Sequence, residues 1–225
     1  METFKYKFLM EVINMKIKKR YVENRNGDKI EINNYIVDID ESMRERCWNF
    51  SKKIIEDENQ FNRMLPENIT SEEEEKLIRI QRTYAGKLAE YAFLKFLQIK
   101  GKEVTEGDML TIYEGQKNVD NFDFITRDNS TVDIKAAFKE NHRNLVVNLE
   151  QLNNIPKDFY VGIKLNSKNY NNNLINPDSI TEAEIFGYCE CEYLNKRTTV
   201  NLGEDFCKTV NLGRLIGIDN LLKKF

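Results

Sequence analysis

Alternating apolar and polar positions predict a β-hairpin over residues 15–39. The segment MKIKKRYVEN runs into Asn26-Gly27-Asp28, and KIEINNYIVDI then returns with alternating apolar positions. An Asn-Gly pair between two alternating segments favours a tight turn, because both residues accept positive φ angles. We therefore expect two antiparallel strands near the start of the chain.

Helical periodicity follows this hairpin in two stretches. Residues 41–64 predict a helix with inward-facing apolar side chains, and a proline-containing segment ends it. A second helix is predicted over residues 71–100, with Glu74 completing a capping box at its start and Gly101 ending it. A break near Gly86 is the alternative to one long helix.

After Gly101 the period changes from helical to alternating, which predicts strands. Strands are expected at residues 104–113, 119–126, 131–138, 145–149, 159–165 and 183–193, an Asn-rich loop at 167–177, and a closing helix at 212–225. The expected fold class is α+β (α/β). We expect a single domain over residues 1–225, in which residues 1–70 form an N-terminal hairpin and helical extension and residues 71–225 form the core and C-terminal elements.

Composition restricts the class of protein. The chain has 225 residues, with 34 Lys or Arg against 37 Asp or Glu, a formal net charge of −3 and 40% apolar residues. This content is too apolar for a disordered chain, and no apolar stretch is long enough to span a membrane. The N-terminus has interleaved charges and no signal-peptide cleavage site, so a cytoplasmic location is expected. The four cysteines lack the spacing of a zinc site, and buried reduced thiols are expected.

Candidate chemistry lies in the predicted hairpin of residues 121–135. Alternation places Asp133 and Lys135 on one face of their strand. Facing residues of an antiparallel pair share a side, so Asp123 on the preceding strand must oppose Asp133 or Lys135. This register requires an odd number of loop residues, which Thr126–Ser130 supplies. Two carboxylates and one ammonium group then converge on one patch.

A divalent cation is the expected partner of such a patch, because two adjacent carboxylates repel each other unless a cation offsets their charge. Mg²⁺ prefers carboxylate and water oxygens, lowers the pKa of a bound water and stabilises charge on a transferring phosphate. Lys135 is then expected to orient the attacking water or to stabilise the transition state of phosphodiester hydrolysis. The alternative is a solvated hairpin with alternating charges, but the apolar residues between Phe122 and Phe138 favour a buried strand pair.

This arrangement resembles the PD-(D/E)XK nuclease superfamily, which has the restriction-endonuclease-like fold. The family pattern places an acid on one strand and D/E-x-K on the next, here Asp123 and Asp133-Ile134-Lys135. Many members carry a Glu on the preceding helix, here Glu90 in GKLAEYAFLKFL. The resemblance covers roughly residues 84–165 and implies a central mixed β-sheet flanked by helices. It implies catalytic roles for Asp123, Asp133, Lys135 and Glu90, and metal contacts from Asp123, Asp133, Ile134 and Glu90. The implied cofactor is Mg²⁺, with Mn²⁺ as a substitute.

Some positions depart from the family pattern or leave alternatives open. Phe122 stands where Pro is usual, and the second acid is Asp instead of Glu; both variants occur in the superfamily. Gln151 follows on a predicted short helix, as in exonuclease-like members, but without the Tyr that accompanies it there. Asp120 is a competing acid on the opposite face of its strand. A polar loop carries His142, for which a surface role is favoured over a contact to substrate phosphate together with Lys139 and Arg143.

The leading functional hypothesis is a Mg²⁺-dependent endodeoxyribonuclease that resembles a type II restriction endonuclease and acts on double-stranded DNA. No G-x-x-x-x-G-K-S/T phosphate loop is present, so no nucleotide cofactor is expected. Cleavage of both strands requires two active sites, which predicts a homodimer. The alternatives are a repair, phage or mobile-element nuclease that acts on branched or single-stranded DNA, and a non-catalytic nucleic-acid-binding module. The N-terminal hairpin and helices are candidates for dimerisation or base reading.

Overall fold

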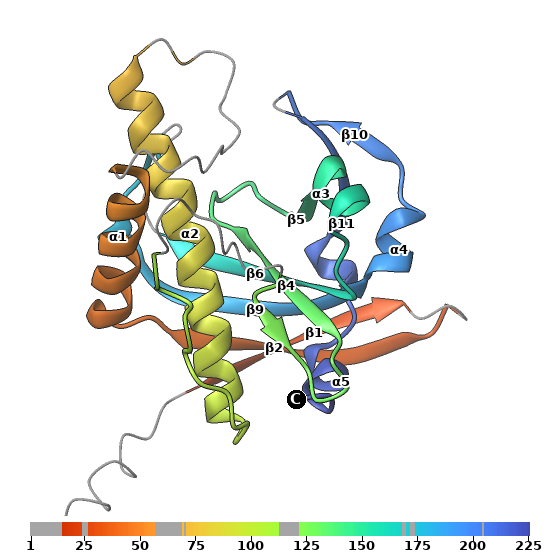
Figure 1. Ribbon diagram of the computed structural model, residues 1–225. Helices are drawn as coiled ribbons and strands as arrows, with labels where there is room; N and C mark the ends of the chain where they lie inside the picture. Colours follow the sequence, from red (N-terminus) through yellow and green to blue (C-terminus); the bar gives the residue numbers. More distant parts are fainter. Residues whose placement is uncertain are drawn as a thin grey trace, which may run out of the picture.

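The computed structural model describes residues 15–23, 27–56, 69, 71–112, 122–167, 170–171, 174–203 and 205–225. Its centre is a six-stranded sheet with the strand order β1-β2-β9-β6-β4-β3 (Figure 1). The strands are β1 (Lys16–Glu23), β2 (Lys29–Asp38), β3 (Phe124–Ile125), β4 (Thr131–Ala137), β6 (Phe159–Ser167) and β9 (Ile180–Glu190). β4 and β6 run parallel and the other neighbours are antiparallel, so the sheet is mixed and the α+β class is confirmed.

The predicted N-terminal hairpin is confirmed, and it belongs to the central sheet. β1 pairs with β2, and β2 pairs with β9. The guanidinium of Arg20 fixes the hairpin in place, because it donates hydrogen bonds of 2.7–2.8 Å to Asn34 Oδ1 and to the carbonyl oxygens of Phe186, Gly213 and Leu215. Asn34 in turn donates to the buried Glu184 carboxylate at 2.7 Å. A buried polar network therefore crosses three strands of the sheet.

Two helices cover one face of the sheet, as Figure 1 shows: α2 (Glu72–Ile99) lies across the strands and α1 (Glu41–Glu56) packs beside it. α2 runs through Gly86 without a break, because packing offsets the cost of about 1 kcal/mol that an interior glycine carries. Gly101 follows the helix with φ of 73°, as expected for a C-terminal glycine. The predicted capping box is wrong: the Ser71 side chain makes no cap hydrogen bond, and four glutamates in the first turn face the positive end of the helix dipole instead.

The larger hydrophobic core lies between α2 and the sheet. α2 contributes a stripe of buried side chains that recurs at helical spacing, including Tyr84, Leu88, Ala92, Phe93 and Phe96. The sheet contributes the alternate positions of its strands, including Phe124, Val132, Ile134, Ile163 and Ile185. Phe93 packs edge-on against Phe124 with ring centroids 5.1 Å apart. This core holds α2 against β3 and β4, the two strands that carry the predicted acids.

The opposite face of the sheet is covered by a second layer. It consists of a three-stranded sheet, β5 (Asn144–Asn148), β11 (Phe206–Asn211) and β10 (Thr199–Asn201), with the short helices α3 (Leu149–Asn154) and α4 (Cys191–Asn195) and the 3₁₀ turn η4 (Leu212–Arg214). Leu145, Val147, Leu212 and Leu215 form a smaller core with Tyr160 of β6. Gly162 allows this layer to approach closely: a Cβ at this position would lie 2.6 Å from Leu215 Cδ1 and 2.7 Å from Leu212 Cδ2.

Several sequence-based boundaries are wrong, each for a local reason. The strand predicted at 104–113 is absent from its described residues, where a turn at residues 107–110 contains Gly107 with φ of 51°. The strand predicted at 183–193 begins earlier and ends at Glu190, where α4 starts. The predicted closing helix is divided into η4 and α5 (Ile218–Leu222) by extended backbone at residues 215–217, where Ile216 forms a β-bridge with Tyr188. The Asn-rich loop contains β7 (Tyr170–Asn171), β8 (Leu174–Ile175) and the turn η3 (Pro177–Ser179).

Two further expectations from the sequence concern the state of the cysteines and membrane-spanning segments. All four cysteines are free; Cys47, Cys189 and Cys207 are buried and Cys191 is half-buried. Burial raises the pKa of the Cys47 and Cys189 thiols to about 12. Within the described ranges, no helix has the length and apolar character to cross a membrane.

Candidate active site

Asp123 lies at the point where β3 and β4 separate. The two strands pair as Phe124↔Val132 and Ile125↔Thr131 around the five-residue loop Thr126–Ser130, so the predicted register is confirmed. One position beyond the last pair, the Asp123 N–H still donates to the Val132 carbonyl at 3.1 Å. The next N–H of β4, that of Ile134, is taken by the Asp123 side chain, whose Oδ2 accepts it at 2.6 Å. A carboxylate thus replaces a backbone partner at the fork between the strands.

Asp133 and Lys135 occupy the same face of β4, as the alternation predicted. Asp133 is buried, with 7% of the residue exposed, and the Lys135 ammonium lies 2.6 Å from its Oδ2. This contact is an ion pair without hydrogen-bond geometry, and within the described residues Asp133 Oδ2 has no hydrogen-bond donor. Lys135 donates instead to Gln151 Oε1 at 2.9 Å. Gln151 therefore joins the site from the first turn of α3.

Glu90 reaches the site from α2. Its side chain is 12% exposed and pairs with Lys87, one turn earlier on the same helix, at 2.6 Å between Nζ and Oε2. The pKa of Asp123 lies well above the ordinary value of an aspartate, first because of burial and then because of the negative charges of Glu90 and Asp133. The Ile134 N–H and the Lys87 ammonium act in the opposite direction. Three carboxylates and two lysines therefore form one coupled electrostatic site.

Lys157 is a member of this site that the sequence did not indicate. The residue precedes β6, is 5% exposed, and donates from Nζ to the Ile155 carbonyl at 2.7 Å. Burial lowers the pKa of its ammonium group, while the charges of Asp133 and Asp123 raise it and that of Lys135 lowers it. A lysine directly after a proline, in a short polar connection, is typical of an exposed turn. Lys157 lies near β4 because β6, the strand that follows it, pairs with β4.

The donor set fits a hard divalent cation, although the arrangement is not that of a formed metal centre. Within the described residues, no group of three or more His, Cys, Asp or Glu side chains is placed to hold one ion together. Two of the three carboxylates face ammonium groups instead, Glu90 that of Lys87 and Asp133 that of Lys135. Asp133 Oδ2 has no hydrogen-bond donor beside its ion pair with Lys135, and the pKa of Asp123 is raised by burial and then by the charges of Glu90 and Asp133. All-oxygen ligands with unsatisfied lone pairs are those that Mg²⁺ prefers.

Other predicted residues lie outside this cluster or contribute through the backbone. Ile134 is held at the site by its N–H, and its metal contact stays a prediction. Asp128 lies in the exposed β3–β4 turn, where Lys224, Thr126 and Ser130 bind its carboxylate and hold its pKa below the usual range. Asp120 falls outside the described residues.

The loop of residues 138–143 leads away from β4 and carries His142. The His142 ring is half-buried and packs edge-on against Phe138, with ring centroids 5.0 Å apart. The buried Lys164 ammonium donates to the carbonyl oxygens of Lys139, Glu140 and His142, and burial lowers its pKa to about 8. The loop is therefore anchored by a lysine of β6. A substrate contact by His142, Lys139 or Arg143 stays a prediction.

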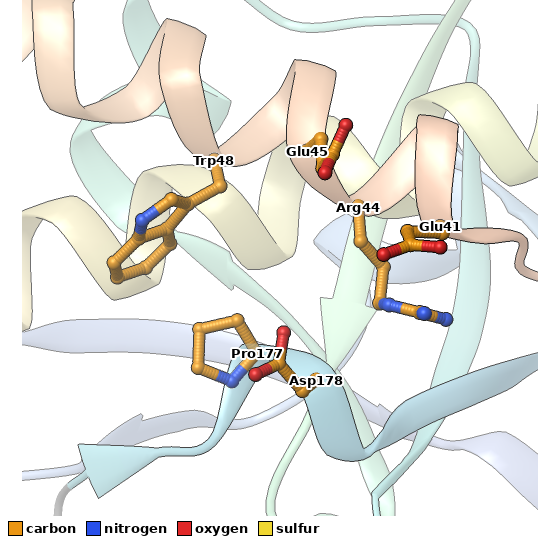
Figure 2. A pocket seen from close by; sticks show the side chains of 6 residues that line it. All are labelled: Glu41, Arg44, Glu45, Trp48, Pro177 and Asp178. Atoms are coloured by element: carbon orange, nitrogen blue, oxygen red, sulfur yellow. The ribbon is translucent and has the colours of Figure 1, made fainter.

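A separate surface hollow lies between α1 and η3. Figure 2 shows Trp48 and Pro177 facing each other across it, with Arg44 and three carboxylates around them. Its volume is about 500 Å³, and it is lined by Glu41, Arg44, Glu45, Trp48, Pro177 and Asp178. None of the predicted catalytic residues belongs to it. The acid and lysine cluster on α2, β3 and β4 is the stronger candidate, because its charges are buried and mutually coupled.

Fold and site together define a mixed α+β protein in which a buried acid and lysine cluster lies at a fork between two strands of the central sheet. Comparison with protein-family models, with curated proteins and with solved structures finds no match to the chain.

Proposed function

We propose that this chain is a Mg²⁺-dependent nuclease that hydrolyses DNA phosphodiester bonds. The observation that carries the proposal is the convergence of Asp123, Asp133 and Lys135 at the fork of β3 and β4, with Glu90 from α2 close enough to raise the pKa of Asp123. Buried carboxylates of like charge destabilise a fold unless a cation offsets them, so such groupings are typical of functional sites.

The proposed role of each side chain follows from its position and its charge. Asp123, Asp133 and Glu90 supply carboxylate oxygens that would hold Mg²⁺, and Mn²⁺ is the expected substitute. A bound Mg²⁺ supplies Lewis acidity toward the scissile phosphate and lowers the pKa of its bound water. Asp123 is held in place by the Ile134 N–H, so its free oxygen has a fixed direction.

We propose that Lys135 acts in the transition state of the reaction. Its ammonium lies between Asp133 and Gln151, at 2.6 Å and 2.9 Å respectively. A lysine in that position stabilises negative charge that develops on the phosphate, or orients the water that attacks it. Gln151 restricts the lysine to one orientation, which reduces the reorganisation that the reaction requires.

The restriction-endonuclease-like fold and a type II restriction function are the finer parts of the proposal. They are supported by the order of the elements: the helix with Glu90, the hairpin with Asp123 and Asp133-Ile134-Lys135, and then β6 parallel to β4. Double-stranded DNA is the proposed substrate. A homodimer is proposed with it, because cutting both strands requires two such sites.

A plasmid-nicking assay tests the proposal directly. The purified chain is incubated with supercoiled plasmid in Mg²⁺, Mn²⁺ or EDTA, alongside the Asp133→Asn variant prepared in the same way. We expect nicked and linear products with Mg²⁺ and Mn²⁺ only, and none from the variant. Binding to DNA without cleavage, on duplex, branched and single-stranded substrates in both metals, would instead identify a non-catalytic nucleic-acid-binding module.

A further inference from the structure

Gln151 reaches Lys135 from α3, a short helix beside β5 and β11 (Figure 1). Only Leu152 of its six residues is buried, so packing contributes little to holding the helix in place. A helix this short is not stable by itself in water, because its few internal hydrogen bonds do not offset the cost of forming the first turn. The contacts at the ends of α3 therefore determine where Gln151 lies.

Asn148 caps the first turn of α3 and is itself held from two sides. Its Oδ1 accepts the N–H groups of Glu150 and Gln151 at 2.7 Å and 3.2 Å. Its backbone lies opposite Cys207 in the pairing of β5 with β11. Its amide nitrogen donates to the carboxylate of Asp205, which lies in the turn between β10 and β11. An ionised carboxylate accepts hydrogen bonds and donates none, so Asp205 turns the oxygen of the Asn148 amide toward the helix.

The turn of α3 that Asn148 caps also carries the side chain that holds Lys135. Gln151 Oε1 accepts from the Lys135 ammonium at 2.9 Å, and within the described residues it is the one hydrogen-bond acceptor of that group. The ion pair with Asp133, at 2.6 Å, lacks hydrogen-bond geometry. Lysine has a flexible four-carbon stem, so the direction of its ammonium group depends on the atom that accepts its hydrogen bond. A continuous chain of hydrogen bonds thus connects Asn148 to Lys135.

We propose that Asn148 is a positioning residue of the candidate active site, which acts through α3 and Gln151 to hold Lys135 in the orientation that the reaction requires. This inference rests on the proposed nuclease function and adds to it a residue from the second layer of the fold. Loss of the cap should lower kcat and leave DNA binding nearly unchanged, because the placement of Lys135 matters mainly in the transition state. A purely structural role would lower stability without this selective effect on the catalysed step.

The experiment compares two asparagines that cap helical turns in the same layer. Asn148→Ala removes the cap of α3, and Asn148→Ser retains a capping oxygen. Asn211→Ala is the matched control, because Asn211 Oδ1 caps η4 by accepting the Gly213 N–H at 2.9 Å. Plasmid cleavage in Mg²⁺ gives kcat and KM, and gel shifts in Ca²⁺ give the DNA affinity.

The variants should differ in kcat and not in binding. We expect Asn148→Ala to lower kcat by about 10- to 100-fold, the loss that a misplacement of about 1 Å at a reacting group can cause. Asn148→Ser should recover most of the lost activity, and Asn211→Ala should retain the wild-type kcat. Combining Asn148→Ala with Gln151→Ala should lower kcat no further than Gln151→Ala alone, because both changes break the same chain of contacts.

A second measurement does not depend on cleavage. Nitrogen-15 relaxation of the lysine ammonium groups reports how well Lys135 is ordered, with the exposed Lys223 as the mobile reference. We expect Lys135 to be ordered in the wild-type chain and more mobile in Asn148→Ala and Gln151→Ala. Asn211→Ala should leave the mobility of Lys135 unchanged.

The two measurements separate the role of Asn148 from the nuclease proposal. If Lys135 stays equally ordered in Asn148→Ala, the positioning role is overturned whether or not cleavage falls. A wild-type chain that cuts DNA, with an Asn148→Ala variant of equal kcat, overturns the positioning role and leaves the nuclease function in place. Equal losses of kcat in Asn148→Ala and Asn211→Ala show general destabilisation and also overturn it. If the wild-type chain cuts no DNA while Asn148→Ala still makes Lys135 mobile, the nuclease function is overturned and the link from Asn148 to Lys135 is supported.

Discussion

Asp123 Oδ2 accepts the backbone N–H of Ile134 at 2.6 Å, so a side chain of one strand completes the hydrogen bonding of the other. Because this N–H is no longer free to pair with backbone, β3 ends and the hairpin opens at this residue. The bond also fixes one carboxylate oxygen, while burial and then the charges of Glu90 and Asp133 raise the pKa of the group. The same hydrogen bond therefore ends the pairing of β3 with β4 and holds the Asp123 side chain in place.

The first prediction separates the acids by activity. Asp123→Asn and Asp133→Asn should abolish metal-dependent cleavage, because each removes a charged oxygen from the site. Asp128→Asn, in the exposed turn of the same hairpin, should retain wild-type activity. Asp120→Asn should also be tolerated. The measurement is the rate of plasmid nicking in Mg²⁺, and equal losses at Asp128 and Asp123 would contradict the assignment.

The second prediction concerns stability in EDTA. Because the pKa of Asp123 is raised in the folded state, the folded chain binds more protons than the unfolded chain. The free energy of unfolding therefore falls as pH rises from the ordinary carboxyl pKa through the raised pKa of the folded state. Asp123→Asn should therefore raise Tm at about pH 7 and raise it less at about pH 5, closer to the ordinary carboxyl value. Asp128 has a lowered pKa, so Asp128→Asn should not raise Tm at either pH. Thermal melts monitored by circular dichroism measure the direction of the Tm change in each variant at each pH.

The third prediction concerns Lys135. Lys135→Ala should reduce the cleavage rate by about 10²- to 10³-fold, the effect of removing one group that stabilises a developing negative charge. Binding of DNA in Ca²⁺ should change little, since the interaction is made mainly in the transition state. Lys223→Ala, an exposed lysine of the C-terminal segment, is the control. Lys135→Ala with a wild-type cleavage rate would remove Lys135 from the mechanism.

The fourth prediction couples metal and substrate binding. Without a cation, Asp123, Asp133 and Glu90 should repel a phosphate, so gel shifts in EDTA should show weak DNA binding. Ca²⁺ should restore binding but support little cleavage, because it is larger than Mg²⁺ and acidifies bound water less. Binding should weaken as salt rises, through release of counterions from the DNA. Tight binding in EDTA would argue against an acidic site at the phosphate.

The fifth prediction concerns the close packing beneath Lys135. Gly162 is the β6 partner of Lys135, and a Cβ there would lie within 2.6–2.7 Å of Leu215 and Leu212. Gly162→Ala should therefore reduce the free energy of unfolding by about 1–3 kcal/mol, the usual cost of overpacking. Adding Leu212→Val to Gly162→Ala should recover part of this loss by making room. Chemical denaturation of the single and double variants measures both effects.

Sequence patterns predicted the elements whose residues repeat at a regular period. The alternation of β4 and the turn of five residues before it were enough to place Asp123 beside Asp133, and this register is confirmed. The same reasoning failed at residues 104–113, where apolar residues pack onto the core from turns. Val104, Met109 and Leu110 are partly buried without forming a strand.

The parts of the site that escaped prediction depend on contacts between distant segments. Lys157 approaches the acids only because β6 pairs in parallel with β4, and a parallel pair is not marked by any local turn. Similarly, the sequence gives no sign that Asn148 joins a hairpin tip to α3. Such contacts follow from tertiary packing, which local periodicity does not encode.

The first two strands also determine which shortened chains can fold. β2 covers the backbone edge of β9, and Asn34 satisfies the buried Glu184 carboxylate. A chain that begins at Glu41 would expose a long apolar strand edge, the kind of surface through which proteins aggregate. It would also leave Glu184 without its amide donor and remove Arg20 from the carbonyl oxygens of Phe186 on β9 and of Gly213 and Leu215 in the second layer. Removal of residues 1–40 should therefore yield insoluble protein rather than a shorter folded chain.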